Sequence, residues 1–225
     1  MGLSVHERHP GQSSLLQTRS FDPYLRLGNM GIDEVEICEF DEDWTYVGCF
    51  GEPCKSCGTR NLHTSSIVIS VDGACSGNGT ANAFMSAGVF FSINSRYNQS
   101  LPLYGPSVTN QVAELRAGIL ALELAMDIWR DERFGEDGNQ RLREVVIKAD
   151  SDYLVKGMTD YIYKWKQNGF LTTKRTRVTN RALFEELEAL VNELNGMGVD
   201  VYFWHVPRSF NQSADRLAKM ASRQT

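Results

Sequence analysis

The stretch that decides the fold is Ile67-Val68-Ile69-Ser70-Val71-Asp72, which is followed directly by Gly73. Most of these residues are apolar and β-branched, and a short run of this kind bounded by glycine is typical of a buried β-strand. A loop of small residues follows over 73–82. Asp72 therefore lies where a buried strand gives way to a loop.

Two further strands and a long helix follow. We expect strands at 87–93 and 100–104, and consecutive strands without an intervening helix favour an antiparallel meander. From Thr109 the apolar residues recur every three or four positions, which predicts an amphipathic helix. These apolar positions are Val112, Leu115, Ile119, Leu122, Met126 and Trp129.

The second half of the chain alternates strands and helices. The pattern predicts strands at 145–150 and 199–203, and helices at 154–165, 183–194 and from 214 onward. Strands connected by helices belong to a sheet with helices on its faces. The sequence thus predicts an α/β fold with a mixed sheet and the order β-β-β-α-β-α-α-β-α.

Length and composition limit the possible classes. The chain has 225 residues, 42% hydrophobic and 23% charged, which excludes collagen, a coiled coil and a wholly disordered chain. No apolar stretch approaches the ~18 residues of a spanning helix, so we expect no membrane partner. Residues 1–16 lack a secretory signal pattern, so we expect an intracellular protein, in the nucleus or the cytoplasm.

The same patterns predict two parts. Residues 64–225 form one domain, and residues 1–63 form a polar and acidic extension that becomes rich in cysteine. Within the extension, residues 1–30 lack a sustained period and are expected to be flexible or loosely docked.

Charge is distributed unevenly. The net charge of −5 alone argues against a nucleic-acid partner. However, residues 31–60 hold eight acidic residues against two basic ones, whereas residues 141–181 hold ten basic residues against four acidic ones. Because a partner responds to the local field, the basic region keeps nucleic-acid binding open.

Four acidic residues lie at the positions where metal chemistry would need them. Asp72 and Asp150 end predicted strands, and Glu114 and Asp215 lie in predicted helices beside apolar residues. Grouped carboxylates repel one another, and oxygen ligands select hard ions such as Mg²⁺ or Mn²⁺. A site with two such ions suits phosphodiester cleavage. The alternative is four unconnected acids among the 28 in the chain.

Four sequence blocks resemble those of type 1 ribonuclease H. They are Val71-Asp72-Gly73-Ala74-Cys75-Ser76-Gly77-Asn78-Gly79, Thr109-Asn110-Gln111-Val112-Ala113-Glu114-Leu115, Ala149-Asp150-Ser151-Asp152-Tyr153 and Asn211-Gln212-Ser213-Ala214-Asp215-Arg216-Leu217-Ala218. The resemblance covers about 66–223. It implies a five-stranded mixed sheet in the order β-β-β-α-β-α-β-α, with helices on both faces. It also implies a monomeric endonuclease that hydrolyses the RNA strand of RNA–DNA hybrids with two Mg²⁺ ions, held by Asp72, Glu114, Asp150 and Asp215.

The resemblance also implies substrate contacts. By position, Asn78, Asn110 and Gln111 would contact the RNA strand, and Thr109 and Asn180 would hold a phosphate of the DNA strand. Each has a structural alternative, since Asn78 lies between two glycines and the others could cap helices. Residues 161–181 interleave aromatic and basic residues, and Trp165 among them either binds nucleic acid or packs in the core.

The chain departs from the family in the loop before Asp215. Many relatives carry a histidine there that assists product release, whereas the loop reads Val206-Pro207-Arg208-Ser209-Phe210-Asn211. We expect His205 to be an ordinary strand residue. Arg208 is a candidate to orient a phosphate instead, and the absent histidine leaves the rate of cleavage open.

The cysteines form the second departure. Four of five lie within twenty residues, and Cys54-Lys55-Ser56-Cys57-Gly58 resembles a zinc knuckle. A tetrahedral site needs two more ligands, for which Cys38, Cys49 and His63 are candidates. The alternative is reduced, inert thiols.

Three hypotheses for function follow. The leading one is a metal-dependent endoribonuclease that cleaves RNA–DNA hybrids and leaves 5′-phosphate and 3′-hydroxyl ends. The second is a module that binds nucleic-acid duplexes and cleaves slowly or not at all. The third is a zinc-bearing interaction protein that uses its acidic segment as a contact surface.

Overall fold

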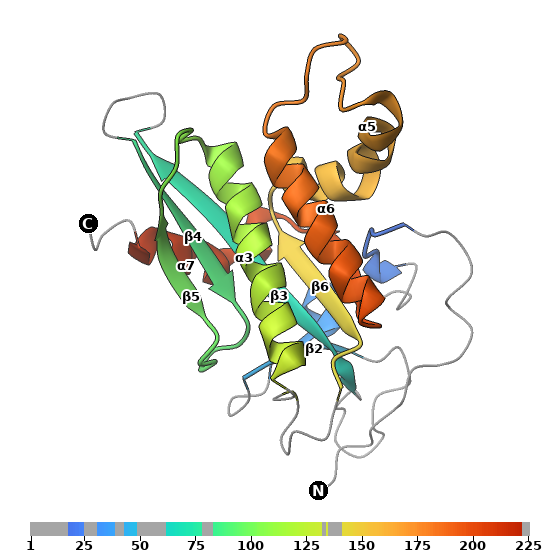
Figure 1. Cartoon of the computed structure of the whole chain (residues 1–225). Coiled ribbons are helices and arrows are strands. Elements are labelled where there is room, and N and C mark those ends of the chain that lie inside the picture. The colour runs from blue at the N-terminus through green and yellow to red at the C-terminus, as the bar shows by residue number, and fades with distance from the viewer. Residues whose placement is uncertain are drawn as a thin grey trace, which may run out of the picture.

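The computed structural model describes residues 18–24, 31–38, 43–48, 62–77, 83–131, 134 and 141–221. Seven strands and the helices around them form an α/β fold in which helices cover both faces of one mixed sheet (Figure 1). None of the described helices is long and apolar enough to cross a lipid bilayer. In chain order the elements are α2 (Ile32–Val35), β1 (Glu36–Cys38), β2 (Thr45–Gly48), β3 (Leu62–Ser76), β4 (Phe84–Phe90), β5 (Gln99–Leu103), α3 (Asn110–Arg130), β6 (Glu144–Ala149), α4 (Asp152–Lys156), the π-helix η1 (Gly157–Tyr161), α5 (Ile162–Asn168), α6 (Arg181–Gly196), β7 (Asp200–His205), the 3₁₀-helix η2 (Arg208–Phe210) and α7 (Gln212–Ala221).

The predicted five-stranded mixed sheet is confirmed as β5-β4-β3-β6-β7. β3, β4 and β5 form the antiparallel meander, and β6 pairs in parallel with both β3 and β7. Ile69 on β3 lies opposite Ile147 on β6, which lies opposite Phe203 on β7. The predicted strand end at Asp72 is wrong, because β3 stays paired with β4 as far as Ser76. The parallel pairing of β3 with β6 ends at Ser70 opposite Lys148, so Asp72 and Asp150 each lie two residues beyond it, at the same end.

The sheet is larger than the sequence predicts. β3 begins at Leu62, and its first half pairs with β2, which in turn pairs with β1. The predicted boundary at residue 63 therefore falls inside a strand. Leu62 and His63 were missed because 62–66 are mostly polar, and their pairing partner lies in the extension.

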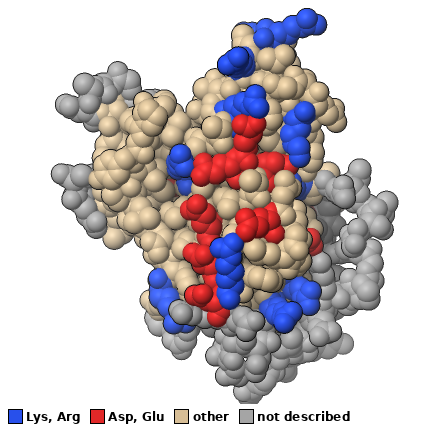
Figure 2. Space-filling model, viewed as in Figure 1, with Lys and Arg blue, Asp and Glu red and all other residues tan. Residues whose placement is uncertain are grey.

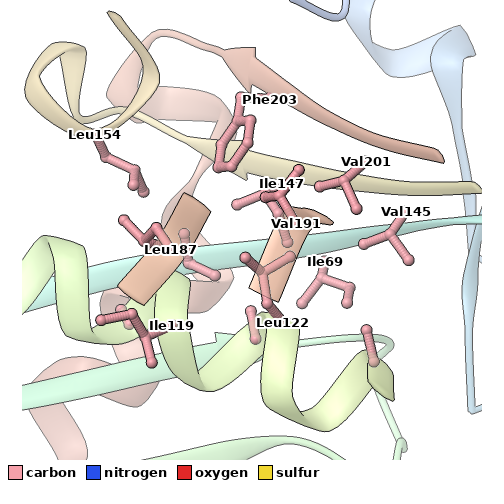
Figure 3. Packing of buried hydrophobic residues seen from close by; sticks show 14 of the residues in the cluster. Ile69, Ile119, Leu122, Val145, Ile147, Leu154, Leu187, Val191, Val201 and Phe203 are labelled. Carbon is pink, nitrogen blue, oxygen red and sulfur yellow. The ribbon is translucent and has the colours of Figure 1, made fainter. Parts of the chain in front are cut away.

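The main core lies between the sheet and the helices α3 and α6. Alternate residues of each central strand point to this side and meet the apolar stripes of both helices (Figure 3). Ile147, for example, packs near Leu122 of α3 and Val191 of α6. All but one of the predicted apolar positions on α3 are buried, and Trp129 is partly buried. The period of 3.6 residues therefore predicted the buried face of α3 correctly.

The opposite face of the sheet is covered by two elements. α7 packs on β4 so closely that a Cβ on Gly88 would lie 2.2 Å from the carbonyl oxygen of Ala214. The extension covers the rest, where Phe21, Val35 and Val47 form a second apolar cluster with residues of β3, β6 and β7. The described parts of the extension thus complete the domain's packing.

The extension also reaches the outer edge of β7. Ser20 bridges Phe203 in parallel, the Phe203 amide donates to the Arg19 carbonyl at 2.7 Å, and the Phe21 amide donates to the Phe203 carbonyl at 2.9 Å. Residues 19–21 are therefore docked, although the lack of a period predicts a loose tail. Short pairing segments of this kind have no periodicity to reveal them.

Candidate active site

Two predicted acids meet where β3 and α3 approach most closely. Asp72 lies in the buried part of β3 and is 5% exposed, and Glu114 lies in the second turn of α3 and is 7% exposed. A Cβ on Gly73 would lie 2.1 Å from the Glu114 nitrogen, so only glycine allows this approach. The Gly73 amide donates to Oε2 of Glu114 at 3.2 Å, which orients that carboxylate.

Asp150 follows β6 and is held by a residue of the last loop. The side chain of Asn211 donates from Nδ2 to Oδ1 of Asp150 at 2.8 Å and to the Val71 carbonyl at 2.9 Å. Asn211 is almost completely buried. One amide therefore ties Asp150 to the strand that carries Asp72.

Asp215 lies in the first turns of α7 and is paired with two cations. Arg208 donates from a terminal nitrogen to Oδ1 at 2.6 Å, and Lys219 donates from Nζ to Oδ2 at 2.6 Å. Asp215 is largely buried, whereas both cations are exposed. These cations hold the pKa of Asp215 below its usual range against the opposing effect of burial.

The pKa values show that the carboxylates share one field. Burial, followed by the charges of Asp150 and Asp215, raises the pKa of Asp72 to about 6. Burial, followed by the charges of Asp72 and Asp150, raises the pKa of Glu114 to about 8. Arg208 partly offsets both effects. Asp72 thus lies in the field of Asp150 and Asp215, and Glu114 lies in the field of Asp72 and Asp150.

The donor set fits a hard divalent cation. Buried carboxylates with raised pKa values are short of positive charge, and oxygen ligands are those that Mg²⁺ and Mn²⁺ prefer. Within the described ranges, no three Asp, Glu, His or Cys side chains converge tightly enough to hold an ion as they stand. Asp215 is instead paired with Arg208 and Lys219. The ligand roles of the four acids therefore stay a prediction.

The residues predicted to contact the RNA strand lie beside the carboxylates. Asn110 opens α3, is exposed, and donates to Glu114 Oε1 over a long 3.5 Å. Gln111 is exposed next to it. Thr109 caps α3, since its hydroxyl accepts from the Val112 amide at 3.2 Å. Asn78 lies outside the described residues.

The predicted DNA-strand contacts lie near the start of α6. Asn180 precedes α6 in a left-handed conformation (φ 60°), and its amide donates to the Tyr153 hydroxyl at 3.4 Å rather than capping the helix. α3 and α6 run side by side in the same direction, so Thr109 and Asn180 lie at the same end of the helix pair (Figure 1).

Trp165 is chiefly a packing residue. Its ring meets Phe184 at 4.9 Å between centroids and also contacts Tyr161 and Phe170. The side chain of Trp165 is also partly exposed on α5, so part of it stays accessible to a bound nucleic acid. Most of its contacts agree with the alternative that Trp165 packs in the core.

Several basic residues lie on the part of the molecule that follows α4. α5 and the loop 169–180, together called the protrusion, stand out beyond α3 and α6, and Lys and Arg residues lie on it (Figures 1 and 2). Asp and Glu residues instead lie over α3 and α6. The exposed cations of the loop are Lys174, Arg175 and Arg177. Arg175 has φ 59°, a left-handed conformation that is costly for arginine.

Most of the predicted zinc ligands cannot be placed. Cys49, Cys54 and Cys57 lie outside the described residues. Cys38 on β1 is a free thiol whose sulfur lies 3.1 Å from the Ser92 hydroxyl oxygen. His63 lies in β3 opposite Val47.

Comparison with known proteins agrees with this geometry. A family model described as RNase H matches residues 64–223. The chain belongs to the RNase H family. Ribonuclease H1 of Homo sapiens is 31% identical over 163 residues, covering 71% of this chain and 51% of the human protein. Ribonuclease H of Nitrosomonas eutropha is 32% identical over 157 residues, covering 68% of this chain and 86% of that protein.

A solved structure supports the fold. The solution structure of the PFV RNase H domain superimposes with a TM-score of 0.51 at 20% identity, covering 70% of this chain and 94% of that domain. This chain spans about half the length of the human Ribonuclease H1 that it matches. The extension lies outside the family match, so the strands β1 and β2 are additions to the RNase H sheet.

Three site residues of this RNase H domain carried only a weak sequence signal. Asn211 was visible only as the first residue of the last block, and Lys219 only as a basic residue four positions after Asp215. Arg208 was only a candidate to orient a phosphate, and its ion pair with Asp215 was not foreseen. His205 is exposed at the end of β7, with Nε2 3.5 Å from Oδ1 of Asp152.

Proposed function

We propose that the protein is an endoribonuclease that hydrolyses the RNA strand of RNA–DNA hybrids with two Mg²⁺ ions, for which Mn²⁺ can substitute. The observation that carries the proposal is the coupled set Asp72, Glu114, Asp150 and Asp215 at one end of the sheet. Membership of the RNase H family supports the substrate and the chemistry. The expected products carry 5′-phosphate and 3′-hydroxyl ends.

The chain's own residues would prepare the site in three ways. The four carboxylates would hold the two ions, which supply an activated water and balance charge on the leaving oxygen. The Gly73 amide and the Asn211 side chain fix Glu114 and Asp150, so these ligands need not reorganise. Arg208 and Lys219 keep Asp215 ionised until a divalent cation competes for it.

Substrate recognition would use the residues around this site. Asn110 and Gln111 are exposed beside Glu114 and can read 2′-hydroxyls, because amides both donate and accept. Thr109 and Asn180 would hold a phosphate of the DNA strand. The cations of the protrusion would extend that contact through phosphate neutralisation.

Asp150→Asn tests this function most directly. The substitution keeps the shape and the partner Asn211 but removes one charge from the ion site. We expect cleavage of a labelled hybrid in Mg²⁺ to be lost and binding of the same hybrid to remain, since phosphate contacts carry affinity. Asp152→Asn, two residues away and exposed, is the matched control and should retain cleavage. Near-normal turnover by Asp150→Asn would remove the assignment.

A second candidate is a binding module with weak or no nuclease activity. The observation that favours it is the loop 206–211, which lacks histidine. Wild-type protein that binds the hybrid but cleaves it at the rate of Asp150→Asn would establish this alternative.

Three further points are proposals. We infer that the protein is a monomer located inside the cell. We also propose zinc binding by Cys54 and Cys57 with ligands from Cys38, Cys49 and His63, supported by the Cys-x-x-Cys-Gly spacing. Metal analysis of protein purified without chelator should find up to about one zinc per chain, and none in Cys54→Ser/Cys57→Ser.

A further inference from the structure

The side chain of Arg19 in the extension connects to two helices of the domain, α6 and α5. Its guanidinium forms an ion pair with Glu188 on α6, and both side chains are nearly buried. A second terminal nitrogen donates to Oδ1 of Asn192 at 3.2 Å. The guanidinium also lies over the ring of Tyr163 on α5, with its central carbon 5.6 Å from the ring centroid.

The backbone around Arg19 is fixed by β7. The Arg19 carbonyl accepts from the Phe203 amide, and Phe21 is buried in the second apolar cluster. The backbone of Arg19 is therefore anchored at the sheet edge through its own carbonyl and through Ser20 and Phe21. Its side chain crosses from that edge to the helices, so it is not a mobile surface cation.

Glu188 joins this anchor to the protrusion. Its Oε2 pairs with Arg19, and its Oε1 accepts from Nζ of Lys166 on α5 at 2.6 Å. Arg19 and Lys166 together hold the pKa of Glu188 below its usual range, against burial. One carboxylate thus bridges the extension to the base of the protrusion.

The protrusion is also held by contacts of its loop, since Phe170 and Val178 are buried in the main core and the Tyr153 hydroxyl donates to the Thr179 carbonyl at 3.0 Å. α5 follows the π-helix η1 and ends at Gly169, whose φ is 76°. Of the residues within α5, only Ile162 is fully buried, and Trp165 contributes its contact with Phe184. The exposed side of α5 gains its ties to α6 through Glu188, which Arg19 and Lys166 share.

We propose that Arg19 is a positioning residue that sets the orientation of the protrusion for hybrid binding. The inference rests on the proposed function, because the loop cations must meet a phosphate backbone for orientation to matter. Rigid placement of these cations lowers the cost of ordering them on binding. Lysine cannot replace arginine fully, since it lacks the planar fork that meets Glu188, Asn192 and Tyr163 together.

Four full-length variants test the proposal. Arg19→Ala removes all three contacts, Arg19→Lys keeps the charge, and Asn192→Ala removes one contact without changing charge. Arg130→Ala is the matched control, because Arg130 also pairs with α6, through Glu193 at 2.8 Å, but lies away from α5. Hydrogen exchange of the amides in α5 is measured without substrate, and Kd for a labelled hybrid is measured in Ca²⁺.

We expect Arg19→Ala to speed exchange in α5 about tenfold and to raise Kd about five- to tenfold, with kcat within about twofold. Arg19→Lys should give an exchange rate and a Kd between those of the wild type and Arg19→Ala. Asn192→Ala should raise Kd about twofold, and Arg130→Ala should change neither the exchange rate nor Kd. If Arg19→Ala does not fold, Arg19→Lys and Asn192→Ala still decide the question. Unchanged Kd in every folded Arg19 and Asn192 variant, or an equal loss in Arg130→Ala, overturns the proposal. Wild-type protein that neither binds nor cleaves the hybrid overturns the proposed function instead.

Discussion

Asn211 holds Asp150 and Val71 with a single side-chain amide, at 2.8 and 2.9 Å. Asp150 follows β6 and Val71 precedes Asp72 on β3, so one buried residue of the loop before α7 fixes the spacing of two carboxylates. The position of these acids therefore depends on the loop 206–211.

Asn211→Ala should lower kcat about 10²-fold and destabilise the fold by about 1–3 kcal/mol. The change leaves Asp150 and the Val71 carbonyl without their shared donor in a buried place. Chemical denaturation and hybrid cleavage measure the two effects. Asn211→Asp should lower both kcat and stability further, because it adds a carboxylate to an acidic cluster. A variant with wild-type kcat would show that Asp150 holds its position without this amide.

Glu114→Gln should stabilise the protein in chelator, and more so as pH rises. A carboxyl group whose pKa is raised from 4.5 to about 8 binds more protons folded than unfolded, so its contribution is lost between those pH values. Gln keeps an oxygen that can accept from the Gly73 amide and carries no charge. The gain above pH 8 should be on the order of 2–4 kcal/mol.

The measurement is the free energy of unfolding at several pH values from 4 to 9, in chelator and in Mg²⁺. Added Mg²⁺ should make the wild type more stable than Glu114→Gln, because the wild-type site binds the ion more tightly. Glu123→Gln, an exposed acid on the same helix, is the control and should show a much smaller pH dependence. If the free energy of unfolding changed with pH equally in Glu114→Gln and the wild type, the carboxylates would not share one electric field.

Arg208→Ala should lower kcat about tenfold with little change in KM. Arg208 pairs with Asp215 and also offsets the raised pKa values of Asp72 and Glu114, so its charge acts on the whole site. Lys219→Ala is the matched control, because it removes the other partner of Asp215 but lies one helical turn further along α7. Equal losses in both variants would mean that only the ionisation of Asp215 matters.

Ser209→His should raise kcat by about tenfold and leave KM nearly unchanged. Ser209 is exposed in η2 and is the nearest equivalent of the family's loop histidine when Asn211 and Asp215 are aligned on the family pattern. General acid–base assistance accounts for a gain of this size. A silent Ser209→His together with a severely impaired Arg208→Ala would indicate that Arg208 has taken over the role.

Neutralising Lys174, Arg175 and Arg177 together should weaken hybrid binding and flatten its salt dependence. Each lost phosphate contact lowers the slope of log K against log salt by ~0.7–0.9. Lys166 is excluded from the set because it bonds to Glu188 and supports α5. Binding is measured at several salt concentrations, with Arg116→Gln on the acidic α3–α6 face as the control. An unchanged slope would identify the loop as a solvated surface.

The sequence by itself determined the five central strands, the main helices that pack on them, and the four acids. The β-branched run before Asp72 and the helical period from Val112 to Met126 are local signals, because burial repeats with the period of each element. The four acids were found because each ends or interrupts an apolar pattern, and the blocks around them identified the family.

Only the tertiary structure decided how the extension and the site are held. Phe21, Arg19 and Asn211 carry no periodic signal, since each depends on distant parts of the chain: Trp204, Glu188 and Asp150, respectively. The coupling of Glu114 with Asp72 likewise depends on the approach of α3 to β3 at Gly73. Pairing partners, buried amides and shared electric fields arise from three-dimensional distance, which local sequence patterns do not encode.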